Sequence, residues 1–411
     1  MGEVYDKVEL LSPCGGFEQL RAAVRFGADA VYLAGPRWGM RARATNFTDD
    51  ELRRAVTYAH ENGVAVHVTL NTLMYDTDID DLPAYLEFLD DVGSDAVIVC
   101  DLGAIALTRR HAPHVAVHVS TQASVTNAAT ALAYARMGAR RIVLAREMTM
   151  GQIAELHRRL GDEVELEAFC HGALCMAVSG RCLLSSALVG PDRAANCGGC
   201  TQPCRWKWSL HEETRPGLSM PVEADETGSF ILSANDLCML EHLDEMVEAG
   251  IASLKIEGRN KGAYYVACVT NAYRHVLDGE DPAIWMAEVE ATSHRPFSCG
   301  FYFGNPTQNP GNVEYARDRR LVAVVDACRA RGGAWEWEVV CRNRAPVGCE
   351  LTVLSPGVPV RRLVLADLTK EVADEEGTRW EEAEALSTNM CRYRMSAPFE
   401  AGTGDMICLP R

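Results

Sequence analysis

Residues 8–34 have the sequence VELLSPCGGFEQLRAAVRFGADAVYLA, in which two apolar runs flank an amphipathic segment. The runs at 8–12 and 30–34 are rich in aliphatic and β-branched side chains, which is typical of buried strands. The segment between them spaces its apolar residues three and four apart and ends at Gly27, a residue type that commonly ends helices. This order of strand, helix and strand predicts one βαβ unit of a parallel sheet.

The same alternation continues through the first 280 residues. Eight apolar runs are expected to be strands, at residues 8–12, 30–34, 65–70, 96–100, 115–120, 141–145, 164–169 and 252–256. Eight strands that alternate with helices predict an α/β fold, a (β/α)8 TIM-like barrel. A doubly wound open sheet is the alternative, but no GxGxxG turn follows the first strand.

The expected barrel covers residues 1–290 and contains a Cys-rich insertion at 172–251, between strands seven and eight. This insertion is too long for an ordinary crossover connection. The segments WKWSL at 206–210 and SFILS at 229–233 are expected to pair as a hairpin within it. The segment DLCMLEHLDEMVEAG, at 236–250, is expected to be the helix that leads into strand eight.

The helical period disappears after residue 290. Residues 291–319 are rich in Gly, Pro and Asn and are expected to be a linker or arm. Residues 320–411 contain short alternating runs, which predict a small all-β barrel domain. Between Glu314 and Arg362 nine arginines face six acidic residues, which indicates RNA contact or, equally well, a solvated surface. The arginines considered for RNA contact are Arg317, Arg319, Arg320, Arg329, Arg331, Arg342 and Arg344.

The composition limits the classes of function. Hydrophobic residues make up 48% of the 411 residues and charged residues 24%, as in globular proteins with a large core. The formal net charge of −17 argues against generic nucleic-acid binding, so a polyanionic partner would have to meet a local basic patch. The N-terminus lacks a signal-peptide pattern, and no stretch approaches the roughly 18 apolar residues of a membrane span. We therefore expect a cytoplasmic protein with no membrane partner.

Six cysteines fall within thirty-five residues, and a seventh follows at Cys238. The six are Cys170, Cys175, Cys182, Cys197, Cys200 and Cys204. Thiols at such spacing bind a metal, bind an iron–sulfur cluster, form disulfides or react, and disulfides are rare in the cytoplasm. The CxxC pair that ends at Cys200 has no second pair to complete a zinc ribbon. A [4Fe–4S] cluster tolerates irregular spacing, so the spacing favours a cluster over zinc while leaving zinc open.

Polar residues follow most of the expected strands. They include Asn71, Asp101, Thr121, Gln122, Arg146, Glu147, His171, Glu257 and Arg259. In a barrel these positions converge on the C-terminal face, where active sites lie. Solvated loops alone would also place polar residues at strand ends, but the cysteine run leaves strand seven onto the same face. Polar residues at the ends of so many strands therefore predict a functional site at this mouth of the barrel.

Several long blocks resemble peptidase family U32, the collagenase-like peptidases. They are LSPCGGFEQLRAAVRFGADAVYLAG, RARATNF, HVSTQASVTN, VLAREMT, LEAFCHGALCMAVSGRCLLSS, CTQPCRW, SANDLC and SLKIEGRNKGAYYV. The resemblance covers roughly residues 7–305, and the trailing β unit resembles the C-terminal module of one branch. Cys14 is a departure, because the family commonly has Ala-Gly there, and it adds a thiol near the barrel mouth.

The resemblance implies an oxygen-independent RNA-modification enzyme with a [4Fe–4S] cluster. Its four-cysteine pattern maps onto Cys175, Cys182, Cys200 and Cys238, with Cys204 as the rival for the third position. The branch with the β module resembles proteins that hydroxylate the wobble uridine of tRNA at carbon 5 and depend on prephenate. A sister branch hydroxylates a cytidine of 23S ribosomal RNA. We therefore expect tRNA as the partner and a dicarboxylate such as prephenate as co-substrate, with rRNA or another substrate as alternatives.

Proteolysis is the other alternative that the family name raises. The chain contains neither HExxH nor GxSxG. His171 and Cys175 could form a Cys–His pair, but a thiolate that ligates iron is not free to attack a carbonyl. A tRNA hydroxylase is therefore expected ahead of a collagenase-like peptidase.

Candidate roles follow from the chemistry of the residues near the barrel mouth. Glu167 and His171 flank the cysteine loop and could transfer protons, and Glu257 is expected to orient Lys255 or Arg259. Arg181, Arg205, Lys255 and Arg259 could bind the carboxylates of prephenate or the phosphates of RNA, although each could also be an ordinary surface ion pair. The candidate catalytic residues are Glu167, His171 and Glu257, and the candidate substrate-binding residues are Asn71, Gln122, Arg146, Arg181, Arg205, Lys255 and Arg259.

Overall fold

The structure is a computed structural model of the chain. It describes residues 8–40, 46–174, 235–304, 318–374 and 377–410 and, within the insertion, 184–190, 193, 198–203, 206, 209–211, 214 and 219–221. In these ranges no helix combines the length and the apolar character that crossing a membrane requires.

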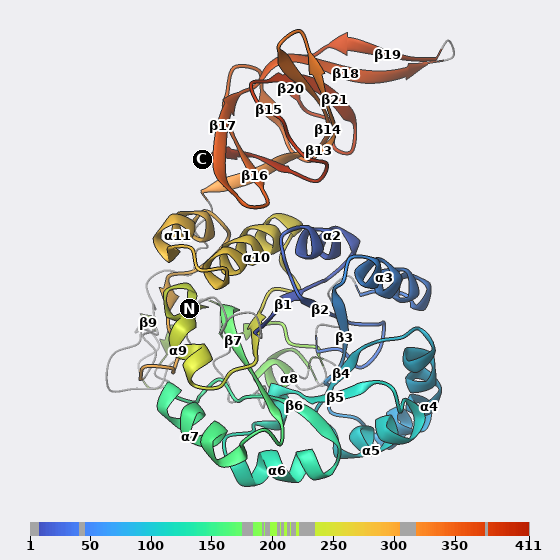
Figure 1. The fold of residues 1–411 in the computed structure, drawn as a ribbon, viewed down its shortest axis with the longest axis vertical. Helices are drawn as coiled ribbons and strands as arrows, with labels where there is room; N and C mark the ends of the chain where they lie inside the picture. The colour runs from blue at the N-terminus through green and yellow to red at the C-terminus, as the bar shows by residue number, and fades with distance from the viewer. Residues whose placement is uncertain are drawn as a thin grey trace.

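Eight parallel strands close into a barrel, as the sequence predicts (Figure 1). They are β1 (Glu9–Pro13), β2 (Ala30–Leu33), β3 (Ala65–Leu70), β4 (Ala96–Val99), β5 (Ala116–Val119), β6 (Ala139–Val143), β7 (Glu165–Ala173) and β11 (Ser253–Ile256). Each strand pairs with its neighbour in this order, and β11 pairs with both β1 and β7 to complete the ring. All eight lie within one or a few residues of the predicted runs.

Helices surround the barrel on its outer face (Figure 1). They are α2 (Phe17–Arg25), α3 (Asp49–Glu61), α4 (Asp76–Asp91), α5 (Leu102–His111), α6 (Ala128–Arg136), α7 (Met150–Leu160), α9 (Leu243–Glu248), α10 (Ala263–Leu277) and α11 (Pro282–Glu290), while α8 (Leu184–Val189) belongs to the insertion. Helix α3 illustrates the local signals, because Thr48 and Glu51 form a capping box at its N-terminus. Its buried residues, Leu52, Ala55, Val56 and Ala59, recur at helical spacing.

The insertion leaves the barrel and returns to it at the end of β7. Strand β10 (Asp236–Cys238) pairs antiparallel with that end, and β12 (Phe297–Ser298) pairs with β10. The prediction of one helix over 236–250 is therefore wrong at its start, because a strand and the short 3-10 helix η6 (Leu240–His242) precede α9. Strand β7 extends beyond its barrel neighbours, and β10 supplies hydrogen-bond partners for its exposed backbone.

The hairpin predicted within the insertion has a different partner. Strand β8 (Ser209–His211) pairs with β9 (Ser219–Pro221), whereas the predicted partner at 229–233 lies outside the described residues. The nearer segment closes a shorter loop, which costs less conformational entropy.

The C-terminal part is an antiparallel β domain, as predicted. Its main sheet has the order β17-β16-β22-β13-β14-β21-β18-β19, with β15 (Ala345–Pro346) and β20 (Ala385–Leu386) forming a separate pair. The strands of the sheet are β13 (Arg319–Arg331), β14 (Ala334–Cys341), β16 (Glu350–Ser355), β17 (Val358–Val364), β18 (Ala366–Asp374), β19 (Gly377–Glu382), β21 (Arg392–Ala397) and β22 (Met406–Pro410). The domain has its own core around Trp337 and Tyr393 and lies beside α2, α10 and α11 (Figure 1).

Several arginines of the net-basic stretch at 314–362 form ion pairs in the structure. Arg319 lies 2.5 Å from Glu288 of α11, and Arg342 lies 3.0 Å from Glu18 of α2. These two pairs join the β domain to the barrel. Other pairs lie within the β sheet, between Arg329 and Glu338, between Arg331 and Glu336, and between Arg362 and Glu350. The excess of arginine in the sequence therefore overstates the free positive charge on this domain.

Candidate active site

A cavity opens at the C-terminal ends of the barrel strands. Six residues that the sequence predicted line it, namely Asn71, Gln122, Arg146, Lys255, Glu257 and Arg259. They come from the ends of β3, β5, β6 and β11, so residues far apart in the chain converge at the face where barrel active sites lie. Tyr32 and Phe169 add aromatic surface to the lining. The structure thus brings these six candidates together, while their individual roles remain predictions.

Arg146 is held in place by three contacts. Its Nη1 donates to the carbonyl of Ala173 at 2.8 Å, and its Nη2 lies 3.4 Å from a carboxylate oxygen of Glu257. The guanidinium also stacks on Phe169, 3.7 Å from the ring centroid. The side chain is therefore oriented before a ligand binds, which reduces the conformational entropy lost on binding.

Lys255 is anchored from inside the barrel. Its Nζ donates to Glu167 Oε1 at 2.7 Å and lies 4.4 Å from the centre of the Tyr32 ring. The carboxylate that binds Lys255 is thus Glu167. The sequence suggested that Glu257 orients Lys255 or Arg259, whereas in the structure Glu257 lies beside Arg146. The long-range pairing depends on the stagger of the barrel strands, which the sequence does not display.

The cavity lining has more positive than negative charge. Among the described residues that line it, Arg146, Lys255 and Arg259 are cationic and Glu257 is anionic. Arg259 is almost fully buried and donates from Nη1 to Thr69 Oγ1 at 3.2 Å. Counting Glu167 beneath Lys255, three cations still face two carboxylates. This arrangement favours a small anionic ligand.

Glycine at position 172 allows the end of β7 to approach Glu257 closely. Gly172 has a φ of +105°, and an added Cβ would lie 2.3 Å from the Glu257 carbonyl oxygen. The Glu257 amide donates to the carbonyl of His171 at 2.8 Å, so the two strand ends are hydrogen-bonded beside this contact. The glycine therefore helps fix the backbone of Glu257 at the rim of the cavity.

Glu167 lies inside the barrel and is fully buried. Burial alone would raise its pKa, but the charges of Lys255 and Arg141 outweigh burial and hold that pKa below its usual value. The side chain is therefore ionised and positions Lys255. The proton-transfer role suggested by the sequence stays a prediction.

His171 lies on β7 opposite Cys238 of β10 and is fully buried. Its Nδ1 is 3.3 Å from the hydroxyl of Tyr273. Burial, with smaller effects from the neighbouring His294 and Lys261, lowers the pKa of His171 to about 3. The imidazole is therefore neutral at pH 7, next to the cysteine rather than in the lining of the cavity.

Two of the predicted cysteine ligands lie in the described part of the chain. Cys238 is buried, its sulfur is 3.9 Å from the Tyr273 hydroxyl, and burial raises its pKa to about 11. The sulfur of Cys200 accepts a hydrogen bond from the Gln202 amide at 3.3 Å. A metal that binds such a thiol displaces its proton, and hydrogen bonds to sulfur tune iron–sulfur clusters. Cys175, Cys182, Cys204, Arg181 and Arg205 lie outside the described residues.

The family model for peptidase family U32 matches residues 15–312, which include seven of the eight barrel strands and the four cysteines predicted to bind the cluster. The chain belongs to peptidase family U32. An uncharacterized protease of Methanocaldococcus jannaschii is 43% identical over 312 residues, which cover 74% of each chain. The tRNA hydroxylation protein P1 of Bacillus subtilis is 39% identical over 308 residues, covering 73% of this chain and 72% of that protein.

A further relative is similar over a longer part of the chain. The tRNA hydroxylation protein P of Escherichia coli is 31% identical over 398 residues, covering 85% of this chain and 86% of that protein. The alignment therefore extends beyond the family-model match at 15–312 and into the β domain.

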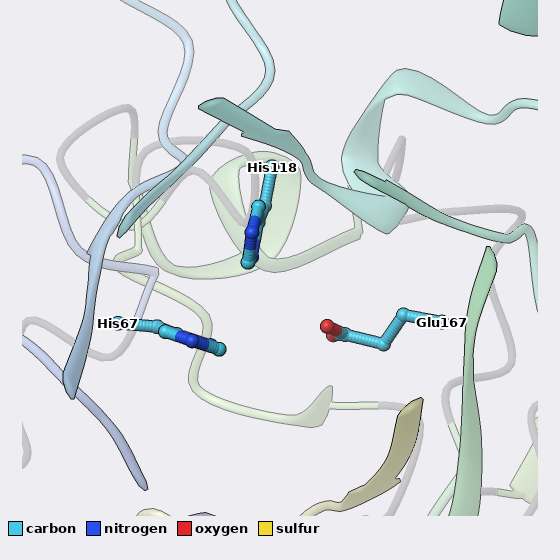
Figure 2. A group of neighbouring side chains, drawn as sticks. All are labelled: His67, His118 and Glu167. Atoms are coloured by element: carbon cyan, nitrogen blue, oxygen red, sulfur yellow. The ribbon is translucent and has the colours of Figure 1, made fainter. Parts of the chain in front are cut away.

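The interior of this U32 barrel contains a cluster of three polar side chains that was not predicted from the sequence. His67 of β3, His118 of β5 and Glu167 of β7 point toward one another (Figure 2). Burial lowers the pKa of both histidines, so both imidazoles are neutral at pH 7. A signal was present in the sequence, because AVHVTL and VAVHVS each place a histidine between valines of a buried strand. Only closure of the barrel brings the two positions together.

Proposed function

We propose that this U32 protein is an RNA hydroxylation enzyme that acts on the wobble uridine of tRNA and uses a small dicarboxylate, such as prephenate, as co-substrate. The observation that carries the proposal is the excess of cations at the barrel mouth, where Arg146, Lys255 and Arg259 surround one lining carboxylate. The similarity of both domains to tRNA hydroxylation protein P supports this reaction class.

The lining residues have distinct roles in this proposal. The guanidinium groups of Arg146 and Arg259 can each bind a carboxylate with two parallel hydrogen bonds, whereas Lys255 offers a point charge. The amides of Asn71 and Gln122 supply neutral hydrogen-bonding groups. Glu257, close to Arg146, keeps that guanidinium at the rim when no anion is bound.

We further propose a [4Fe–4S] cluster held by Cys175, Cys182, Cys200 and Cys238, with Cys204 as the rival of Cys200 and zinc as the alternative metal. The buried thiol of Cys238 and the amide-bonded sulfur of Cys200 fit such ligation. A bound cluster would supply electron transfer beside the neutral imidazole of His171, which could hold or accept a proton there.

RNA binding must use local contacts, because a protein with a net charge of −17 gains no long-range attraction to phosphate. The ion pairs of Arg319, Arg329, Arg331 and Arg342 reduce the free charge of the β domain. We therefore expect tRNA binding that is weak at physiological salt. A cytoplasmic location follows from this proposal.

Gene deletion followed by nucleoside mass spectrometry of tRNA and rRNA tests the function. The deletion should remove a 5-hydroxyuridine-type nucleoside from tRNA, and the wild-type gene should restore it. Arg259→Gln and Lys255→Met should fail to restore it, whereas Arg158→Gln, an exposed arginine on α7, should restore it fully. Anaerobically purified wild type should contain about four irons and four sulfides per chain, and Cys238→Ala should lose them.

Three results would contradict the proposal in different ways. If the deletion instead removes a modified cytidine from rRNA, the substrate is rRNA and not tRNA. Unchanged nucleosides, together with gelatin cleavage that Cys175→Ser abolishes, would establish a peptidase. Stoichiometric zinc in place of iron would rule out the cluster. The substrate would then still be decided by the nucleoside mass spectrometry.

A further inference from the structure

We propose that the barrel interior contains a metal site in which His67, His118 and Glu167 bind one divalent transition-metal ion. These residues lie on β3, β5 and β7 and are separate from the cysteines proposed for the cluster. The inference is independent of the proposed function, because it rests on the arrangement of three buried side chains.

The geometry suits one ion. Each residue offers one ligand atom, and the three atoms lie within 4.8 Å of one another. Figure 2 shows the two rings and the carboxylate directed at a common space between their strands. Ligands of one ion with bonds of about 2.0–2.2 Å lie roughly 3–4.4 Å apart, so small changes in side-chain torsion bring all three into reach.

The histidine nitrogens are available as donors. Nδ1 of His67 and Nδ1 of His118 are buried and have no hydrogen-bond partner among the described residues. The two residues are 3% and 4% exposed, so bulk water does not satisfy these atoms. Buried polar atoms in folded proteins are nearly always paired. Two rings beside one carboxylate, each with an unpaired nitrogen, therefore point to a missing ligand.

Glu167 also has an oxygen to share. Its Oε1 accepts from Lys255 at 2.7 Å, whereas its Oε2 lies 3.5 Å from Arg141. Among the described residues, Oε2 therefore has one long contact with a cation, and it can turn toward an ion. Lys255 can keep its bond to Oε1, so ion binding need not break the pair that orients it.

The surrounding charges permit a cation. The groups nearest the three ligands are Arg141, Lys255, Glu9, Glu165 and, from the solvent side, Arg140. Arg140 and Glu165 are 72% and 37% exposed and lie 3.8 Å apart, so they neutralise each other at the solvent side. The remaining groups are Glu9 and Glu167 against Arg141 and Lys255, and the imidazoles are neutral. The interior is therefore close to charge balance before an ion binds.

The ligand set defines the class of ion. Two imidazoles and one carboxylate suit Zn²⁺, Fe²⁺, Co²⁺ or Mn²⁺, whereas Ca²⁺ and Mg²⁺ prefer a shell of oxygen atoms. Three protein ligands also leave coordination positions open. Because Glu167 anchors Lys255, an ion here would be coupled through one carboxylate to the cation that faces the cavity.

Cobalt(II) is a suitable probe, because its visible spectrum distinguishes ligand types. The full-length, anaerobically purified protein would be dialysed against Co²⁺, with bound cobalt quantified by mass spectrometry and difference spectra recorded against the untreated protein. We expect one Co²⁺ per chain with d–d bands and no thiolate charge-transfer band. The same binding should persist in Cys238→Ala, which separates this site from the cysteines.

His67→Gln and His118→Gln should each weaken Co²⁺ binding at least tenfold, as loss of a ligand requires. His114→Gln, whose side chain is 86% exposed, is the matched control and should bind as the wild type does. Thermal melting checks that each variant is folded, and Glu167→Gln replaces any histidine variant that is not. Absence of bound Co²⁺ in folded wild type, or binding unchanged in both folded histidine variants, would overturn the proposal.

Discussion

The barrel interior and the β domain surface both pair basic side chains with glutamates, but the two settings have opposite consequences. Lys255 and Glu167 are 5% and 0% exposed, so neither charge is hydrated. Arg331, paired with Glu336 on the β domain, is 76% exposed and remains hydrated whether or not the pair forms. The comparison teaches that a buried pair fixes the position of a functional side chain, whereas a surface pair mainly cancels charge.

The largest expected effect is from breaking the buried pair. Glu167→Ala leaves the ammonium of Lys255 and the guanidinium of Arg141 without this carboxylate, which should cost about 3–5 kcal/mol of unfolding free energy. Urea denaturation of the barrel measures the loss. Glu381→Ala, which breaks an exposed pair with Arg379, is the control and should change stability little. Equal effects in both variants would remove the distinction between the two regions.

Acid should destabilise the barrel before it affects the exposed pairs. His171 has an ordinary pKa near 6.5 when unfolded and about 3 when folded, so the unfolded state binds more protons between these values. Stability contributed by neutral His171 is therefore present above about pH 6.5 and is lost as pH falls toward 3. The effect should amount to about 1–2 kcal/mol between pH 6.5 and pH 5.3. His171→Gln should flatten the decline in urea midpoints, while His114→Gln should leave it unchanged.

The smallest effect is expected at the β domain surface. Arg331→Ala should change the unfolding free energy by less than about 1 kcal/mol, because its pair is exposed. Since Glu336 already neutralises this arginine, the tRNA affinity should fall by less than tenfold. This limit corresponds to a loss of about 1.4 kcal/mol of binding free energy. A fluorescence titration at two salt concentrations measures both the affinity and its salt dependence. A larger loss would show that the paired arginines exchange their glutamates for phosphates and contact RNA directly.

The sequence was sufficient to predict the barrel because each strand is a continuous apolar run set between amphipathic helices. Strand β10 was missed because three residues, Asp236–Cys238, have no strand pattern of their own and are held by the end of β7. The cavity residues were found because strand-end positions converge in any barrel. The contacts that these residues make could not be predicted. Glu167 and Lys255, for example, are 88 positions apart and meet only because of the stagger of the barrel strands.

The return of the chain to β7 fixes both ends of the insertion at one place. Ala173 pairs with Asp236, so the insertion begins and ends at the same pair of strands. Doubling the length of such a loop adds only about 0.6 kcal/mol of closure entropy. The length of the chain between these anchors therefore has little effect on the pairing that keeps Cys238 opposite His171. The fold in this way separates the length of the insertion from the register of the two strands that bracket it.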